Sequence, residues 1–204
     1  MRLKFFTLEF YLLHETAIEV KWNGPFSWPA FESENNLFPL PKKLGVYLQT
    51  FLYQNGYLIY AAGITRRPFS TRFKEHTRRY MNGEHSVLDI AAARQGIRRE
   101  IWHGWDCARK HREEFENRKI VILDAVNKQL AGFCIFVTEL GTAPRILERF
   151  EASIMNSLYQ QSSPICDIPD KGMYLSPRYD SEAAIIVKNN CAHILYGLPT
   201  FLKI

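Results

Sequence analysis

Two tyrosines, an arginine and a histidine follow one another in the first half of the chain at spacings that suit phosphodiester chemistry. Tyr47 and Tyr60 lie in two consecutive apolar runs, and Arg72 and His76 follow them four residues apart. On a helix, residues four apart share one face, where an arginine and a histidine can contact an anion together. The alternative is an ordinary solvated basic face. Beside the two tyrosines, this pair indicates a site that holds a phosphodiester and takes a proton from water.

A carboxylate late in the chain is the fifth candidate. Residues 144–160 begin at a proline and carry apolar side chains at helical spacing, and Glu151 lies on or beside that apolar face. Burying an unpaired carboxylate is costly, so Glu151 requires a partner such as a metal ion or an arginine. The alternative is a salt bridge at the rim of the core.

The elements that must position these residues are a β-hairpin and two helices. Residues 45–53 and 57–65 have strand character and are separated by an Asn-Gly turn signal. A loop and a proline then precede a helix that we expect to run to about Tyr80 and to stop at Asn82-Gly83. Phe69, Phe73 and Tyr80 would form its buried stripe.

Two more strands are expected at residues 119–126 and 133–140, before the helix of residues 144–160. Together these patterns predict an α/β fold of the α+β type. We expect a small central, mainly antiparallel sheet flanked by helices, with a helical insertion. The five candidate residues would cluster on one side of that sheet.

The chain of 204 residues is long enough for one domain with a substantial core. Residues 1–44 would form an N-terminal arm packed on the core, with a strand at residues 3–13. Residues 45–161 would form the core itself, with the insertion at residues 84–118. Residues 162–204 would be a C-terminal extension of the same domain.

The net charge of +5 favours an anionic partner. Residues 84–118 interleave basic side chains with Trp102 and Trp105, a pattern that suits a phosphate backbone and base edges, although an ordinary charged surface is the alternative. The basic residues that we predict to contact nucleic acid are Arg66, Arg67, Lys74, Arg79, Arg94, Arg98, Arg109 and Arg112.

The four cysteines form no CxxC pair, which favours reduced thiols in a cytoplasmic protein. His103, Cys107 and His111 are spaced for one helix face. The only further pair with ligand spacing, Cys191 and His193, is far away in the sequence, so we do not predict a zinc site. No apolar run approaches the length of a membrane span, and we expect no membrane partner.

Taken in order, these residues resemble the GIY-YIG nuclease superfamily. Gly45-Val46-Tyr47 matches the first signature with valine for isoleucine, and Ala62-Gly63-Ile64-Thr65 looks like the end of the second. Arg72 and His76 match the family's Arg-xxx-His, and Glu151 matches its metal-binding glutamate. The likeness covers about residues 45–80 and 132–160.

The second signature departs from the family pattern. Two alanines follow Tyr60, so either Tyr60 is displaced by one residue or Ala61 occupies the place of the tyrosine. Loss of that tyrosine would weaken or abolish activity. This departure motivates an alternative, a nucleic-acid-binding module that retains the fold without cleavage. A third alternative is an unrelated α/β protein with a coincidental pattern.

The resemblance implies an endonuclease that hydrolyses DNA phosphodiesters at one active site with one divalent ion, Mg²⁺ or Mn²⁺, bound by Glu151. Tyr47 would deprotonate or orient the attacking water, with Tyr60 as a second-rank candidate. Arg72 and His76 would hold the phosphate and balance its charge. A compact restriction-type enzyme fits better than a homing type, and a homodimer on a palindromic site would follow from that assignment.

Overall fold

The computed structural model describes residues 16–140 and 143–204, so the strand expected at residues 3–13 lies outside the described residues. The described strands are β1 (Thr16–Ser27), β2 (Gly45–Tyr53), β3 (Gly56–Thr65), β4 (Val87–Leu88), β5 (Glu100–Trp102), β6 (Phe133–Thr138), β7 (Ile185–Cys191), β8 (Leu195–Tyr196) and β9 (Phe201–Lys203). The described helices are α1 (Glu32–Asn35), α2 (Phe69–Met81), α3 (Ile90–Ala93), α4 (Asp106–Lys110), α5 (Arg112–Gly132) and α6 (Pro144–Tyr159).

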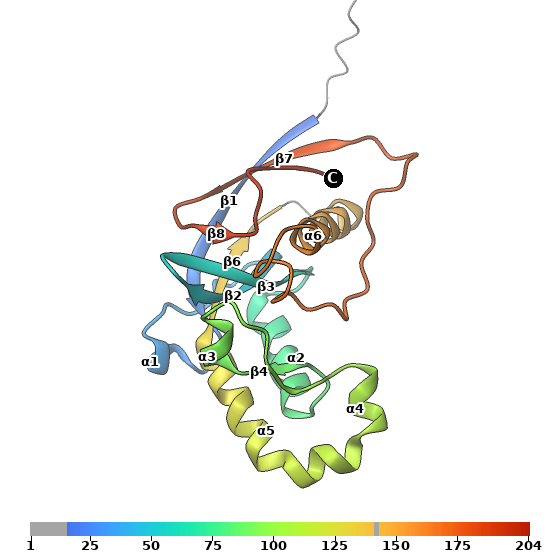
Figure 1. The fold of residues 1–204 in the computed structure, drawn as a ribbon. Coiled ribbons are helices and arrows are strands. Elements are labelled where there is room, and N and C mark those ends of the chain that lie inside the picture. Colours follow the sequence, from blue (N-terminus) through green and yellow to red (C-terminus); the bar gives the residue numbers. More distant parts are fainter. Residues whose placement is uncertain (1–15, 141–142) are drawn as a thin grey trace, which may run out of the picture.

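The described strands form one curled sheet of seven, in the order β8-β3-β2-β6-β1-β7-β9, and a separate β4-β5 pair. The mixture of helices and strands agrees with the predicted fold class, and most neighbours in the large sheet are antiparallel. Figure 1 shows α2 and α5 at one end of the molecule and α6 at the other.

The sheet is larger than predicted because both ends of the chain add strands to it. β1 lies between β6, which is antiparallel to it, and β7, which is parallel to it. Val20 pairs with Asn189 and Phe26 with Ile135, so β1 is an inner strand rather than part of an arm packed on the core. The prediction of a small sheet was therefore wrong.

The predicted hairpin and its two helices are present. β2 and β3 pair antiparallel from Gly45 with Thr65 to Tyr53 with Gly56. Helix α2 follows Pro68, buries Phe69, Phe73 and Tyr80, and ends before Gly83, whose positive φ of 74° suits glycine. Helix α6 begins at its predicted proline.

The strand predicted at residues 119–126 was wrong, because these residues belong to helix α5. Branched apolar side chains suggested a strand, yet Ile120 and Val121 are exposed. The buried residues Phe115, Ile122 and Val126 instead follow helical spacing. Ion pairs four residues apart lie along the exposed face and support the helix.

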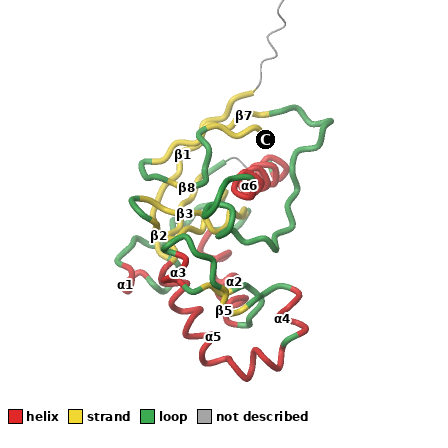
Figure 2. Tube along the Cα trace, in the orientation of Figure 1, coloured by secondary structure: helices red, strands yellow, loops and turns green. Residues whose placement is uncertain are grey.

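The predicted helical insertion at residues 84–118 is also not what the structure shows. This segment contains the short β4-β5 pair, the short helices α3 and α4, and the first turns of α5. Loops connect these elements and fold them against α5. Figure 2 shows this mixed segment, and it also shows that the chain between α6 and β7 is loop throughout.

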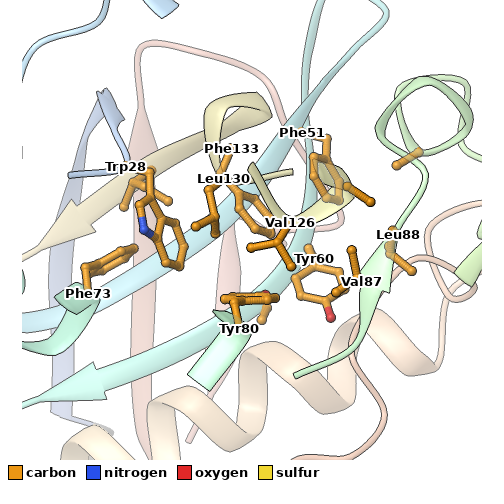
Figure 3. Close-up of a cluster of buried hydrophobic side chains, with 14 of the residues drawn as sticks. Trp28, Phe51, Tyr60, Phe73, Tyr80, Val87, Leu88, Val126, Leu130 and Phe133 are labelled. Atoms are coloured by element: carbon orange, nitrogen blue, oxygen red, sulfur yellow. The ribbon is translucent and has the colours of Figure 1, made fainter. Parts of the chain in front are cut away.

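Each face of the sheet has its own core. Tyr47 and Phe51 of β2 point into a cluster with α2 and α5, whereas Val46 and Leu48 point into a second cluster with α6. Alternation along a strand explains this division. In the first cluster, the Trp28 ring is edge-on to Phe73, with 4.7 Å between ring centroids, and stacks on Phe133, with 5.4 Å between centroids. Figure 3 shows these rings with their neighbours.

Candidate active site

The five predicted catalytic residues line one small cavity of about 80 Å³, namely Tyr47, Tyr60, Arg72, His76 and Glu151. They come from β2, β3, α2 and α6. The expectation that they lie on one side of the sheet needs correction, because α6 packs on the face opposite α2. Glu151 reaches the cavity along the edge of β3 that faces away from β2, which we call the outer edge.

The outer edge of β3 holds Glu151 in place. The amide of Ala62 donates to the sulfur of Met155 at 3.1 Å, and the amide of Ile64 donates to the Glu151 carboxylate. Met155 and Glu151 are one turn apart on α6 and so lie on one side of the helix. Ala62 and Ile64 are two residues apart on β3, so their amides point to the same edge of the strand. Helix and strand therefore meet in register, which fixes where the carboxylate lies.

Tyr47 is positioned by a glycine on the neighbouring strand. Gly63 pairs with Tyr47, and a Cβ atom at position 63 would lie 2.2 Å from Cζ of the Tyr47 ring. No side chain fits that space. Burial raises the pKa of Tyr47, while the positive charge of Arg72 opposes that rise.

Two histidines form a hydrogen-bonded series with the Tyr47 hydroxyl. The hydroxyl lies 2.7 Å from Nε2 of His76, and Nδ1 of His76 lies 3.2 Å from Nε2 of His85. Burial lowers the pKa of His76 well below its ordinary value, and neighbouring Arg72 adds to that effect. Burial also lowers the pKa of His85 to about 4. Both imidazoles are therefore neutral near pH 7.

His85 was not among the predicted site residues. It follows α2 by four residues, after the chain turns at Gly83 and runs back toward the cavity. The sequence showed that the helix would stop at Asn82-Gly83. The only signal for His85 as a site residue was that it closely follows this stop.

Arg72 has a donor that the protein does not use. Its Nε is buried and has no hydrogen-bond partner within residues 16–140 and 143–204. Its Nη1 lies 3.4 Å from Glu75, and the guanidinium also interacts with the Tyr47 hydroxyl. A buried unpaired donor is costly. A phosphate oxygen in the adjoining cavity would satisfy it.

Glu151 is a largely buried carboxylate with little positive charge beside it. Burial raises its pKa to about 7, although Arg72 and the Ile64 amide oppose that rise. The described residues contain no cluster of three acidic, histidine or cysteine side chains suited to a metal. Mg²⁺ commonly binds through one or two carboxylates and keeps its remaining positions for water and phosphate. A one-carboxylate site fits this ion.

A β-bulge resolves the position of Tyr60. Gln49 pairs with Ala61 and Thr50 with Ile59, so Tyr60 is the extra residue between two ladder pairs. Both Tyr60 and Ala61 belong to the core cluster that contains Tyr47. Tyr60 therefore lies on the same face as Tyr47, as Ala61 does. Burial holds its pKa well above the ordinary value, so it stays protonated.

The predicted nucleic-acid contacts separate into several groups. Arg79, Arg109 and Arg112 line a groove of about 1050 Å³ that shares Arg79, His85 and Trp105 with the inner cavity. Arg66 and Arg67 line a hollow on the other side of Arg72, and Lys74 is exposed on α2. Arginine side chains thus flank the cavity on two sides. The groove is of mixed charge, because Glu84 and Asp106 also line it, and Arg109 and Arg112 pair with Asp106 and Glu116.

Arg94 and Arg98 do not join these surfaces. Arg94 lines a separate hollow with Lys128 and Gly132. Arg98 donates from Nη1 to the backbone carbonyls of Ile168 and Pro169 at 2.7 and 3.1 Å, and it pairs with Glu100. Arg98 therefore has a structural role in joining β5 to the loop after α6.

No family model matches this chain, and comparisons with curated proteins and with solved structures found no match. None of the helices in the described part of the chain has the length and apolar character that a membrane span requires. The four cysteines are partly buried and free of disulfides.

Proposed function

We propose that this protein is a divalent-metal-dependent DNA endonuclease of restriction type, which hydrolyses phosphodiester bonds at the cavity around Tyr47. The observation that carries this proposal is the convergence of Tyr47, Arg72, His76 and Glu151 on one cavity that adjoins a groove lined by three arginines. Each of these side chains suits one requirement of phosphodiester hydrolysis.

Arg72 binds the scissile phosphate. Its Nε, which is unpaired among the described residues, would donate to a phosphate oxygen. The positive charge of the guanidinium would stabilise the extra negative charge of the transition state. Arg66 and Arg67 on one side, with Arg79, Arg109 and Arg112 on the other, bind the flanking phosphates.

Tyr47 and His76 handle the proton of the attacking water. The water oxygen bonds to phosphorus while the bond to the leaving sugar oxygen breaks, and that oxygen keeps the electron pair and takes a proton from solvent. The Tyr47 oxygen takes the proton of the water, as its own hydroxyl hydrogen passes to Nε2 of His76, 2.7 Å away. A neutral imidazole offers one nitrogen lone pair to accept this hydrogen, and the lowered pKa of His76 favours return of the proton afterwards.

Glu151 would hold Mg²⁺ or Mn²⁺. A bound divalent ion would supply positive charge beside the phosphate and acidify a neighbouring water. Its charge would also compensate the buried carboxylate, whose pKa of about 7 reflects burial without sufficient positive charge nearby.

The test is a metal-dependent nicking assay on plasmid DNA with Glu151→Gln and the matched control Glu148→Gln. Glu148 lies one turn earlier on α6 and pairs with Arg145 at 3.5 Å. We expect cleavage by the wild type in Mg²⁺, a fall of several orders of magnitude for Glu151→Gln with DNA binding retained, and little change for Glu148→Gln. DNA binding by the wild type without cleavage would favour the binding module. The absence of both binding and cleavage would overturn the proposal.

A further inference from the structure

We propose that His85 is a positioning residue that fixes the tautomer of His76, so that Nε2 of His76 is the nitrogen free to accept the proton of Tyr47. The inference rests on the proposed function. It is carried by the hydrogen-bonded series in which the Tyr47 hydroxyl, the His76 ring and the His85 ring follow at 2.7 and 3.2 Å.

The geometry allows two arrangements of hydrogens. A neutral imidazole has one N–H and one lone pair. If Nδ1 of His76 donates to Nε2 of His85, then Nε2 of His76 accepts from Tyr47. If His85 donates instead, Nε2 of His76 already carries a hydrogen and accepts no proton. The direction of the His76–His85 bond therefore decides whether Tyr47 can pass on its hydroxyl hydrogen.

A phosphate bound in the groove selects the productive direction of the His76–His85 hydrogen bond. His85 lines both the inner cavity and the groove, and no hydrogen-bond partner for its Nδ1 occurs among the described residues. A DNA phosphate in the groove accepts from Nδ1–H, which leaves Nε2 of His85 as an acceptor for His76. Substrate binding then orients the whole series toward Tyr47.

The surroundings of His85 keep its ring in this orientation. Tyr80 of α2 lies 4.8 Å from it and Trp105 lies 5.4 Å from it, between ring centroids. The charges of Arg79 and Arg72 also face it, and they disfavour a protonated His85. When His76 gains the Tyr47 proton, it shares its Nδ1 hydrogen with Nε2 of His85, in the way that a carboxylate supports the histidine of a hydrolase triad.

The experiment compares His85→Phe, His85→Gln and the exposed control His111→Phe. Phenylalanine keeps the ring packing but offers no acceptor, whereas glutamine places an amide oxygen near the former Nε2. We expect His85→Phe to lower kcat roughly 10- to 100-fold, as is typical when a catalytic group loses its supporting partner, and to raise KM by a smaller factor because one phosphate contact is lost. His85→Gln should recover most of kcat, and His111→Phe should match the wild type.

A second readout does not depend on cleavage. Ring-nitrogen chemical shifts of ¹⁵N-labelled His76 report its tautomer. With a DNA duplex bound, we expect Nδ1–H in the wild type and in His85→Gln, and a change in His85→Phe. An unchanged His76 tautomer, or wild-type kcat in His85→Phe, would overturn the inference. A wild type that never cleaves would remove the proposed function, while the nitrogen shifts would still decide the role of His85.

Discussion

The ring of Tyr47 lies directly against the backbone of Gly63, so closely that a Cβ atom there would be 2.3 Å from the tyrosine hydroxyl oxygen. The two residues are paired across β2 and β3. The glycine of the hairpin thus leaves room for the Tyr47 side chain.

Gly63→Ala should therefore displace the Tyr47 ring and break its 2.7 Å contact with His76. We expect a loss of cleavage on the order of 100-fold, because a shift of about 1 Å at a reacting group has this effect. DNA affinity should be nearly unchanged. In a Tyr47→Phe background the same substitution should add little further loss, since both act on one hydroxyl. Additive losses in single-turnover cleavage would show that Gly63 acts elsewhere.

Glu151 should make stability depend on pH. Its pKa is raised from 4.5 to about 7 in the folded protein, so the folded state binds the proton more tightly than the unfolded state. The contribution of Glu151 is fully present below about pH 4.5 and is lost as the pH rises to 7, with an upper limit of roughly 3 kcal/mol. Glu151→Gln should remove this loss, as denaturant titrations at pH 4.5 and 7.5 would reveal.

A divalent ion should offset the same loss. At pH 7.5, Mg²⁺ should raise the Tm of the wild type and of Glu148→Gln, but not that of Glu151→Gln, because only a site with the carboxylate binds the ion in the folded state. Equal shifts in all three proteins would mean that the ion binds elsewhere.

The groove should account for much of the salt dependence of DNA binding. Replacing both Arg109 and Arg112 by glutamine should lower the slope of log affinity against log salt by about 2, one for each lost phosphate contact. Arg94→Gln is the matched control, because Arg94 lines a separate hollow. If Arg94→Gln lowers the slope as much as the double variant does, the groove is not the DNA surface.

Arg98 should behave differently from the other basic residues. Arg98→Gln removes a charged donor from the carbonyls of Ile168 and Pro169, and we expect a loss of about 2 kcal/mol of folding stability. The salt slope of DNA binding should stay the same. Thermal unfolding and a salt titration of one variant separate these two effects.

Local signals in the sequence were sufficient to predict the elements that carry the candidate residues. The β2-β3 hairpin, α2 and α6 each have their own turn, proline or periodicity, and these predicted Tyr47, Arg72, His76 and Glu151 as candidates. The strand expected at residues 119–126 failed because branched residues there are exposed on a long helix, and composition outweighed periodicity in that prediction.

Features that depend on distant pairing could not be predicted. β1 and β7 are parallel neighbours although Trp22 and Asn189, whose side chains are hydrogen-bonded, lie 167 residues apart. The approach of His85 to His76 depends on a chain reversal, and the loop contacts of Arg98 depend on a segment about 70 residues away. Neither leaves a periodic pattern in the sequence.

The position of Glu151 on the far layer of the sheet has a consequence for the order in which the site is assembled during synthesis. A nascent chain that has emerged only as far as residue 140 contains Tyr47, Arg72 and His76 but lacks the helix that packs Met155 and Glu151 against β3. Unfinished chains on the ribosome would therefore carry Tyr47, Arg72 and His76 without the carboxylate. Any activity that needs all four side chains would appear only after α6 had packed on the sheet.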